Sequence, residues 1–438
     1  MSKTSAYNFD TLSLHAGQQP DPQYGARAAP IYLTTSFVFK DADQAAALFN
    51  MERAGHVYSR ISNPTNAVLE ERIAALEGGV GAIAAASGQA ALHLAICTLM
   101  GAGGHIVASR SLYGGSHNLL EYTLPRFGIE TTFVNPRDLD AWRAAIRPET
   151  RLLFGETLGN PGLDVLDVPR VAEIAHAAGL PLMVDSTFTT PYLMRPFDLG
   201  ADLLFHSATK FLGGHGVAIG GLLVDSGKFD WERHAKRFPL LNEPDPSYHG
   251  AVWTQAVKPL GPIAYIIRAR VVLLRDLGAA MSPFNAFLFL QGLETLPLRM
   301  REHCRNAQAV ASYLRGHPQV TKVIFPGFTD GEQQRRAAAY LKGGFGGLVG
   351  FELKGGKEAG RRFIDALKLF YHVANIGDAR SLAIHPATTT HSQLAPEEQL
   401  KTGVSDGFVR LSVGLEHIDD ILGDLDQALA AAAPAKAA

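Results

Sequence analysis

Lys210 ends the motif HSATK, which follows the apolar run DLLF and precedes the glycine-rich stretch FLGGHG. The run predicts a strand, and in open α/β sheets ligands bind beyond the carboxyl ends of the strands. A lysine at such an end can be desolvated enough to act as a nucleophile and a base. Ser207 and Thr209 add hydroxyls suited to phosphate oxygens. An isolated SxTK is more often a surface loop, so the other motifs decide between the two interpretations.

Asp185 ends a second apolar run, LMVD. A carboxylate there could keep a pyridine nitrogen protonated, which makes the ring an electron sink for a carbanion. An aspartate at a strand end is otherwise a common capping or turn residue. Combined with a lysine that can form a Schiff base, Asp185 points to pyridoxal 5′-phosphate (PLP) as the cofactor.

Two further motifs suit the phosphate and the ring of such a cofactor. Ser87, Gly88 and Gln89 open an Ala/Leu-rich helix, whose exposed N–H groups and positive dipole end attract phosphate. Tyr113 in SLYGG follows the apolar run HIVAS and could stack on a flat ring, although a core tyrosine is an equal alternative. The chain contains no GxxxxGK[ST] loop, and no GxGxxG follows a first strand.

Two arginines suggest anion contacts. Tyr58 and Arg60 in YSRISNPT precede the first periodic helix; such a pair can bind phosphate, and the irregular N-terminal region could carry it to another subunit. A solvated turn is the alternative. Arg410 lies in the otherwise apolar strand candidate FVRLSV, where a substrate carboxylate or an internal ion pair would be its partner.

The elements that position these residues alternate along the chain. Short apolar runs of strand length (HIVAS, ETTFV, RLLFGE, LPLMVDS, DLLFHSA, GGLLVD) alternate with helix-like segments such as VPRVAEIAHAAGL. This pattern predicts an α/β protein with a mostly parallel central sheet and a smaller α+β C-terminal domain. We expect an N-terminal arm over 1–65, a large domain over 66–281 and a C-terminal domain over 282–438. Residues 229–262 interrupt the rhythm, as an ordered insertion or a plain surface loop.

Composition limits the possible partners. Forty Lys and Arg against 42 Asp and Glu give no general case for nucleic-acid or membrane-surface binding. Cys97 and Cys304 are isolated and form neither a disulfide framework nor a zinc spacing. The N-terminus lacks an apolar core of signal-peptide length, so we expect a cytoplasmic protein without a bound metal.

The motifs together resemble the Cys/Met-metabolism family of PLP enzymes, with the aspartate-aminotransferase-like fold type I. They occur in family order over nearly the whole chain: YSRISNPT, SGQAA, SLYGG, ETLGNP, VDSTFTTP, HSATKFLGGHG, SLAIHPATTTH and VRLSVGLE. The resemblance implies that Lys210 carries the cofactor and moves protons, that Asp185 pairs with its ring nitrogen and that Tyr113 stacks on its ring. It implies that Asn160 lies near the 3-oxygen of the cofactor and that Arg410, with the Ser381 region, binds the substrate carboxylate. The residues that would hold the phosphate are Ser87, Gly88, Gln89, Ser207 and Thr209.

The resemblance has consequences for assembly and activity. Tyr58 and Arg60 would complete a neighbouring subunit's site, giving a dimer that pairs into a homotetramer. Within the family, the N-terminal stretch, the phrase NIGDARSLAIHPATTTH and the insertion after Gly227 are most similar to enzymes that replace the acetate of O-acetylhomoserine with sulfide or methanethiol. Such an enzyme would serve methionine biosynthesis. The alternatives are a cystathionine γ-synthase, a methionine γ-lyase and a non-catalytic PLP-binding protein.

Overall fold

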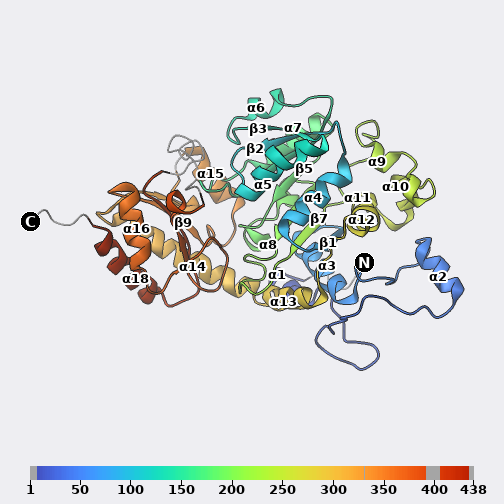
Figure 1. The fold of residues 1–438 in the computed structure, drawn as a ribbon, viewed down its shortest axis with the longest axis horizontal. Coiled ribbons are helices and arrows are strands. Elements are labelled where there is room, and N and C mark those ends of the chain that lie inside the picture. The colour runs from blue at the N-terminus through green and yellow to red at the C-terminus, as the bar shows by residue number, and fades with distance from the viewer. Residues whose placement is uncertain (1–6, 330, 391–404, 434–438) are drawn as a thin grey trace, which may run out of the picture.

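The computed structural model describes residues 7–329, 331–390 and 405–433. They form two units, each built on its own sheet (Figure 1). The strands of the first sheet are β1 (Gly81–Ala85), β2 (His105–Ser109), β3 (Glu130–Val134), β4 (Thr150–Glu156), β5 (Leu182–Asp185), β6 (Leu203–Ser207) and β7 (Gly221–Asp225). Those of the second are β8 (Val320–Ile324), β9 (Leu348–Leu353), β10 (Tyr371–His372), β11 (Leu382–Ile384) and β12 (Phe408–Ser412).

The first sheet has the order β1-β7-β6-β5-β4-β2-β3. Strands β2 to β6 pair in parallel, whereas β7 runs antiparallel to both β6 and β1. The expectation of a mostly parallel sheet is confirmed. The reversal at β7 has a local reason: a parallel return needs a crossover, which is usually a helix. The segment after β6 is the glycine-rich FLGGHGVAIG, in which the structure has turns and no helix.

Helices cover this sheet and begin where the sequence supplies caps. Helix α3 (Pro64–Glu77) starts at Asn63, whose side chain accepts a hydrogen bond from Thr65 N, and ends at Gly78 with φ 77°. Helix α4 (Gly88–Leu99) starts at Ser87, whose hydroxyl accepts from Ala90 N at 3.0 Å. Such caps satisfy N–H groups that lack partners inside the helix. The other helices here are α5 (Gly114–Asn118), α6 (Leu139–Ala144), α7 (Val168–Ala177), α8 (Thr190–Leu193), α11 (Ala264–Arg268) and α12 (Arg275–Leu277).

The second sheet has the order β10-β11-β12-β9-β8. The predicted strands GGLVGFEL and FVRLSV become β9 and its antiparallel neighbour β12. Helices α16 (Gly356–Ala366) and α18 (Ile418–Ala432) pack against each other. The predicted stripe of α18 puts Ile421, Leu425 and Leu429, all fully buried, into the core of this unit. Helix α15 (Gly331–Tyr340) precedes β9.

One long helix belongs to both cores. Helix α14 (Leu296–Gly316) has 21 residues and spans about 31 Å. Its first half places Leu296, Met300 and Cys304 in the core of the first unit. Its second half places Val310 and Leu314 in the core of the second. Helix α13 (Pro283–Glu294), just before it, packs on α3. The boundary expected at 281/282 stays a prediction.

The N-terminal region and the insertion are ordered in different ways. Helix α1 (Phe9–His15) packs on α3, whereas the segment with α2 (Ala42–Phe49) extends away from both sheets (Figure 1). Residues 229–262 form turns and short helices, which include α9 (Pro239–Asn242) and α10 (Trp253–Ala256). Their buried Trp231, Phe238 and Trp253 join the core of the first unit, so this stretch is a packed part of the fold.

Within the described ranges, no helix combines the length and apolarity needed to cross a bilayer. The same residues contain no group of three or more His, Cys, Asp or Glu side chains arranged to hold a metal ion.

A buried carboxyl at the end of β7 makes stability depend on pH. Asp225 is 1% exposed and accepts a hydrogen bond from Gly227 N at 2.8 Å. Burial raises its pKa to about 7. Because the pKa is raised in the folded state, the folded chain binds the extra proton, and this stability is lost as pH rises from about 4 to about 7.

We therefore expect Asp225→Asn to remove a pH dependence of up to about 1.4 kcal/mol per pH unit in that range. Urea denaturation at pH 5 and pH 8 measures the free energy of unfolding of both proteins. The free energy of unfolding of the variant, relative to that of the natural protein, should be higher at pH 8 than at pH 5. An equal difference at both pH values would contradict the assignment.

Candidate active site

A pocket of about 270 Å³ lies at the carboxyl ends of the parallel strands. Its floor comes from three adjacent strand ends: Glu156 ends β4, Asp185 ends β5 and Ser207 ends β6. The opening of α4 and Arg410 of β12 complete it. The structure brings most of the predicted site residues into this pocket: Ser87, Gly88, Gln89, Tyr113, Asn160, Asp185, Ser207, Thr209, Lys210 and Arg410.

Lys210 lies in this pocket with its Nζ donating a hydrogen bond to Oδ1 of Asn375. Burial lowers the pKa of Lys210, and the positive charge of Arg410 lowers it further. A lowered pKa leaves more of the amine in the neutral form that can attack a carbonyl carbon or take a proton. The geometry therefore suits the nucleophile and base expected from HSATK.

Asp185 is held at the floor of the pocket by Thr187. The backbone N–H of Thr187 donates to Asp185 Oδ1 at 2.9 Å, and its hydroxyl donates to the same oxygen. Ser207 N in turn donates to the Thr187 hydroxyl at 2.9 Å, which ties the ends of β5 and β6 together. Burial raises the pKa of Asp185, while the Thr187 hydrogen bonds oppose the rise. A cationic ring nitrogen beside this carboxylate would offset the cost of burying its charge.

The opening of α4 is packed too closely for side chains. A Cβ added to Gly88 would lie 2.9 Å from Ser207 Cβ, and one added to Gly221 would lie 2.0 Å from Ser87 O. Thr209 is fixed through its hydroxyl, which accepts from Gly220 N at 3.1 Å. The backbone N–H groups at the helix start and the hydroxyl of Ser207 thus share one small region, as a phosphate site requires.

Arg410 comes from the other sheet and faces the same pocket. Burial lowers its pKa to about 10. Among the described residues, no carboxylate lies close enough to form an ion pair with its guanidinium. The alternative that Arg410 forms an internal ion pair is therefore not seen within the described residues. A partly buried guanidinium without an internal carboxylate suits the binding of an anionic group in the pocket.

Three predicted site residues lie elsewhere in this chain. Arg60 lies over the Tyr58 ring, with Cζ 5.4 Å from its centroid, and donates to the carbonyl of Arg275. Neither residue lines the pocket of its own chain. Ser381 is fully buried and donates its hydroxyl to Glu416 Oε2 at 2.9 Å, away from the pocket lining. The last residue of SLAIHPATTTH, His391, lies outside the described residues.

Several lining residues were not predicted from the sequence. Glu156 pairs in register with Asp185 across β4 and β5, and its Oε1 accepts from Tyr113 N at 2.5 Å. Burial, with the charge of Asp185 added, raises the pKa of Glu156 well above its usual range. The quoted motif ETLGNP begins with this residue, so a carboxyl at the end of a strand beside that of Asp185 was the available signal. Thr187 and Asn375 also stand in such motifs, VDSTFTTP and NIGDARSLAIHPATTTH, but neither residue type marked its side chain as part of the pocket.

The groups in the pocket match the functional groups of PLP. The Lys210 amine suits its aldehyde, the Asp185 carboxylate suits its ring nitrogen, and the donors around Gly88 and Ser207 suit its phosphate. Arg410 remains available for an amino-acid carboxylate. The parallel sheet with a pocket at its carboxyl edge, and a smaller second sheet that adds one arginine, defines a PLP-dependent enzyme of fold type I.

Comparison with known proteins assigns the family. Residues 10–430 match the model of the Cys/Met metabolism PLP-dependent enzymes, and the chain belongs to this family. It is 53% identical to O-acetyl-L-homoserine sulfhydrylase of Leptospira meyeri, with 96% of each chain covered. It is 52% identical to homocysteine synthase of Schizosaccharomyces pombe, over 96% of this chain and 98% of that one.

A solved structure agrees with these relatives. A Campylobacter jejuni protein described as an O-acetylhomoserine (thiol)-lyase superposes with a TM-score of 0.92 at 40% identity, over 97% of this chain and 100% of that one. That structure carries a pyridoxyl-lysine phosphate at its position 205. The expected fold and the expected cofactor are therefore confirmed.

Substitution at Glu156 tests how the pocket holds Tyr113. Burial raises the pKa of Glu156, and Glu156→Gln, an uncharged side chain of nearly the same shape, keeps the acceptor for Tyr113 N. Glu156→Ala removes that acceptor, at a cost of about 1–3 kcal/mol. We expect the alanine variant to bind PLP roughly tenfold more weakly and the glutamine variant to bind it nearly as the natural protein does. Absorbance titration of the cofactor-free protein measures this, and equal affinity of the two variants would contradict it.

Proposed function

We propose that this protein catalyses a γ-replacement in which O-acetylhomoserine and sulfide give homocysteine and acetate, with methanethiol as an alternative acceptor that gives methionine. The observation that carries the proposal is the convergence of the Lys210 amine, the Asp185 carboxyl and the Arg410 guanidinium on one pocket. The relatives named as O-acetyl-L-homoserine sulfhydrylase and homocysteine synthase support the choice of substrates.

Bound PLP supplies an electron-withdrawing ring that stabilises negative charge next to the amino nitrogen. Lys210 would hold the cofactor covalently through Nζ, and once the amino group of the substrate has displaced it, the freed Lys210 amine would take the Cα proton. Asp185 would keep the ring nitrogen protonated, Tyr113 would stack on the ring, and Asn160 would contact the 3-oxygen. The residues that would hold the phosphate are Ser87, Gly88, Gln89, Ser207 and Thr209.

Arg410 binds the α-carboxylate of the substrate and thereby orients Cα toward Lys210. Its charge also lowers the pKa of Lys210. When the substrate carboxylate neutralises that charge, this lowering of the Lys210 pKa would be relieved, so the amine would be a stronger base once the substrate has released it. Leu158, Phe188, Ile219 and Ile376 line the rest of the pocket, and the more buried of them, Leu158, Phe188 and Ile376, would limit the access of water to the reacting carbons. Ser381 would support this site only indirectly, because its backbone N–H and its hydroxyl both donate to the Glu416 carboxylate, which fixes the position of this segment.

Product analysis with the purified holoenzyme tests the activity. We expect homocysteine and acetate from O-acetylhomoserine plus sulfide, and loss of turnover by at least about a thousandfold in Lys210→Ala, because the proton-transfer and cofactor-binding amine is gone. Lys354→Ala, which changes an exposed lysine, is the matched control.

Other products would identify the rival functions. Cystathionine formed with cysteine as the acceptor indicates a cystathionine γ-synthase, and 2-oxobutanoate with methanethiol from methionine indicates a methionine γ-lyase. PLP binding without any turnover indicates a binding protein. Full activity of Lys210→Ala would contradict the role of the lysine.

The assembly belongs to the same proposal. Tyr58 and Arg60 lie outside their own pocket, and the arm around them exposes large apolar side chains: Tyr24, Leu33, Val38 and Phe49 are 82%, 73%, 101% and 63% exposed. Such a surface marks a subunit contact. We infer a dimer in which each arm brings Tyr58 and Arg60 to the partner's phosphate site, and two such dimers form a cytoplasmic homotetramer.

Subunit complementation tests the shared site. Lys210→Ala and Arg60→Ala subunits are each expected to be nearly inactive, because one lacks the amine and the other lacks a phosphate contact. Mixed after partial dissociation, they should regain up to about a quarter of the natural activity, since some dimers then contain one site with both residues intact. Light scattering reports the oligomer size. Mixtures no more active than either variant alone would contradict a shared site.

A further inference from the structure

Helix α14 buries three polar side chains on one of its faces. Arg299, His303 and Asn306 follow one another at spacings of four and three residues, which places them on one stripe of the helix about 10 Å long. They are 5%, 0% and 0% exposed, and we call them the polar stripe of α14. Apolar residues would fill this part of the core without the cost of burying polar groups. The hydrogen-bond partners of the three side chains therefore indicate what the stripe does.

The first residue of the polar stripe holds the loop that carries Lys210. Arg299 donates hydrogen bonds to Phe211 O at 2.7 Å and to Leu212 O at 3.1 Å, the carbonyls of the two residues after Lys210. Within the described residues, its guanidinium donates only to uncharged oxygens, and burial lowers its pKa to about 10. A Cβ added to Gly214, four residues after Lys210, would lie 2.2 Å from Arg299 Nη1. The guanidinium and the loop thus fit closely, and Arg299 fixes the backbone beside Lys210.

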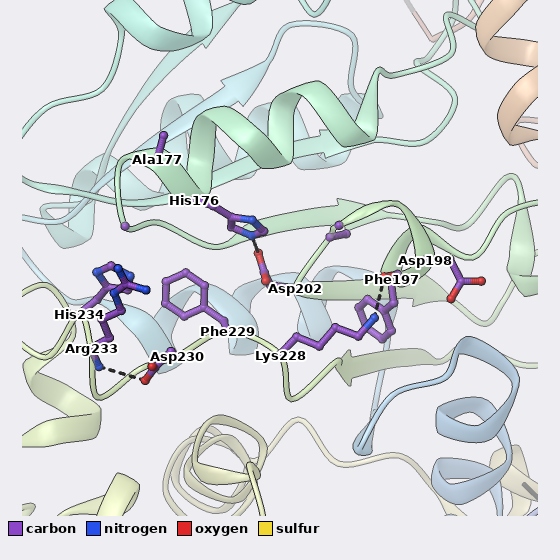
Figure 2. Close-up of a pocket in the computed structure, with 13 residues that line it drawn as sticks. His176, Ala177, Phe197, Asp198, Asp202, Lys228, Phe229, Asp230, Arg233 and His234 are labelled. Carbon is purple, nitrogen blue, oxygen red and sulfur yellow. Dashed lines mark hydrogen bonds and ion pairs between the residues drawn. The ribbon is translucent and has the colours of Figure 1, made fainter.

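The strand before this loop is fixed separately at its other end. Asp202, just before β6, accepts hydrogen bonds from His176 Nε2 and from Leu182 N, both at 2.8 Å. Figure 2 shows the contact between His176 and Asp202, which borders a pocket of about 540 Å³. Because β6 has five residues, this contact lies roughly 16 Å from Ser207 at the carboxyl end of the strand. It fixes the start of β6, whereas Arg299 holds the chain beyond its end.

The other two residues of the polar stripe hold the segment that follows Arg410. His303 Nδ1 bonds to Val413 O at 2.7 Å, and since a carbonyl oxygen only accepts, Nδ1 is the donor. Asn306 Nδ2 donates to Gly414 O at 3.1 Å. Val413 and Gly414 come three and four residues after Arg410. The backbone that carries Arg410 is therefore fixed to the same face of α14.

A ring contact links the two halves of the polar stripe. The His303 ring lies edge-on to the Phe211 ring, with the centroids 5.2 Å apart and an interplanar angle of 85°. Phe211 directly follows Lys210, so His303 contacts both functional segments. A Cβ added to Gly347, just before β9, would lie 3.1 Å from the Phe211 ring and 3.3 Å from His303 Cβ, which leaves little room for a larger residue. One helix therefore contacts the chain after each of the two cations of the cofactor pocket.

We propose that the polar stripe of α14 is a set of positioning residues that fixes the Lys210 amine relative to the Arg410 guanidinium. Arg299 acts on the segment after the lysine, and His303 and Asn306 act on the segment after the arginine. The inference rests on the roles proposed above for Lys210 and Arg410. None of the three stripe residues lines the cofactor pocket, so each acts through the backbone. Such control matters because a misplacement of about 1 Å can lower a reaction rate about a hundredfold.

Two readouts test the two halves of the stripe separately. The rate at which cofactor-free protein attaches PLP to Lys210, followed by absorbance, reports the position of the lysine. The concentration of L-norvaline, an amino acid without a leaving group at Cγ, that half-saturates the absorbance change of the holoenzyme reports the Arg410 side.

We expect Arg299→Met to slow PLP attachment at least about tenfold and to change the L-norvaline concentration less than about threefold, because it removes only the donors to the lysine loop. Asn306→Leu should show the reverse pattern, since it removes only a donor to the segment after Arg410. Arg299→Lys keeps a charged donor group, so its attachment rate should fall between those of Arg299→Met and the natural protein, and it carries the test if the methionine variant does not fold.

His176→Ala is the matched control, because it removes a side-chain hydrogen bond at the start of the strand that leads to Lys210. It should lower the midpoint of thermal unfolding without changing either readout. Equal losses of both readouts in Arg299→Met and Asn306→Leu, or a loss of either in His176→Ala, would show a general effect on stability and overturn the inference.

Natural values of both readouts in both variants would overturn it as well, and so would an attachment rate for Arg299→Lys as low as that of Arg299→Met. If L-norvaline causes no absorbance change in the natural protein, the Arg410 half of the inference is wrong. Neither readout uses O-acetylhomoserine or sulfide, so a failure of the proposed γ-replacement is detected separately by product analysis.

Discussion

Lys210 and Arg410 bring two positive charges into one small, partly buried pocket, and no carboxylate among the described residues pairs with the arginine. Burial lowers both pKa values, and the charge of the arginine lowers that of Lys210 further. An anion bound beside Arg410 would relieve this repulsion. The pKa values of the two carboxyl groups on the floor shift in the other direction. Glu156 and Asp185 pair in register, and burial raises both pKa values. A ring cation bound beside Asp185 would favour its charged form.

Sheet topology explains how much of this site could be read from the sequence. Asp185, Ser207 and Lys210 follow neighbouring apolar runs, and parallel strands bring their carboxyl ends to one edge, so their proximity was predictable. Glu156 was quoted only as part of a motif, because a single strand end does not reveal which strand lies beside it. Asn375 lies 165 positions from Lys210, and no local pattern reports a contact across two units. Ser381 was placed by resemblance, while its hydroxyl is taken by Glu416.

The fold itself was accessible for the same physical reasons, with two limits. Alternating runs and helix-like segments indicate a parallel sheet, but only the short glycine-rich return after β6 explains why β7 reverses direction. Residues 229–262 lack a repeating pattern, so the sequence left open whether they pack. In the structure their aromatic residues do pack, and the Trp231 ring stacks on the Tyr265 ring with the two centroids 5.4 Å apart.

The single helix α14 shared by both cores sets how Arg410 and Lys210 meet. Each added residue would turn everything beyond it by about 100° and advance it by about 1.5 Å. One insertion near Cys304 would therefore rotate the β12 sheet away from the end of β6 and leave the guanidinium facing a different direction. A change in the length of α14 would therefore displace Arg410 from the cofactor pocket without altering any residue that lines it.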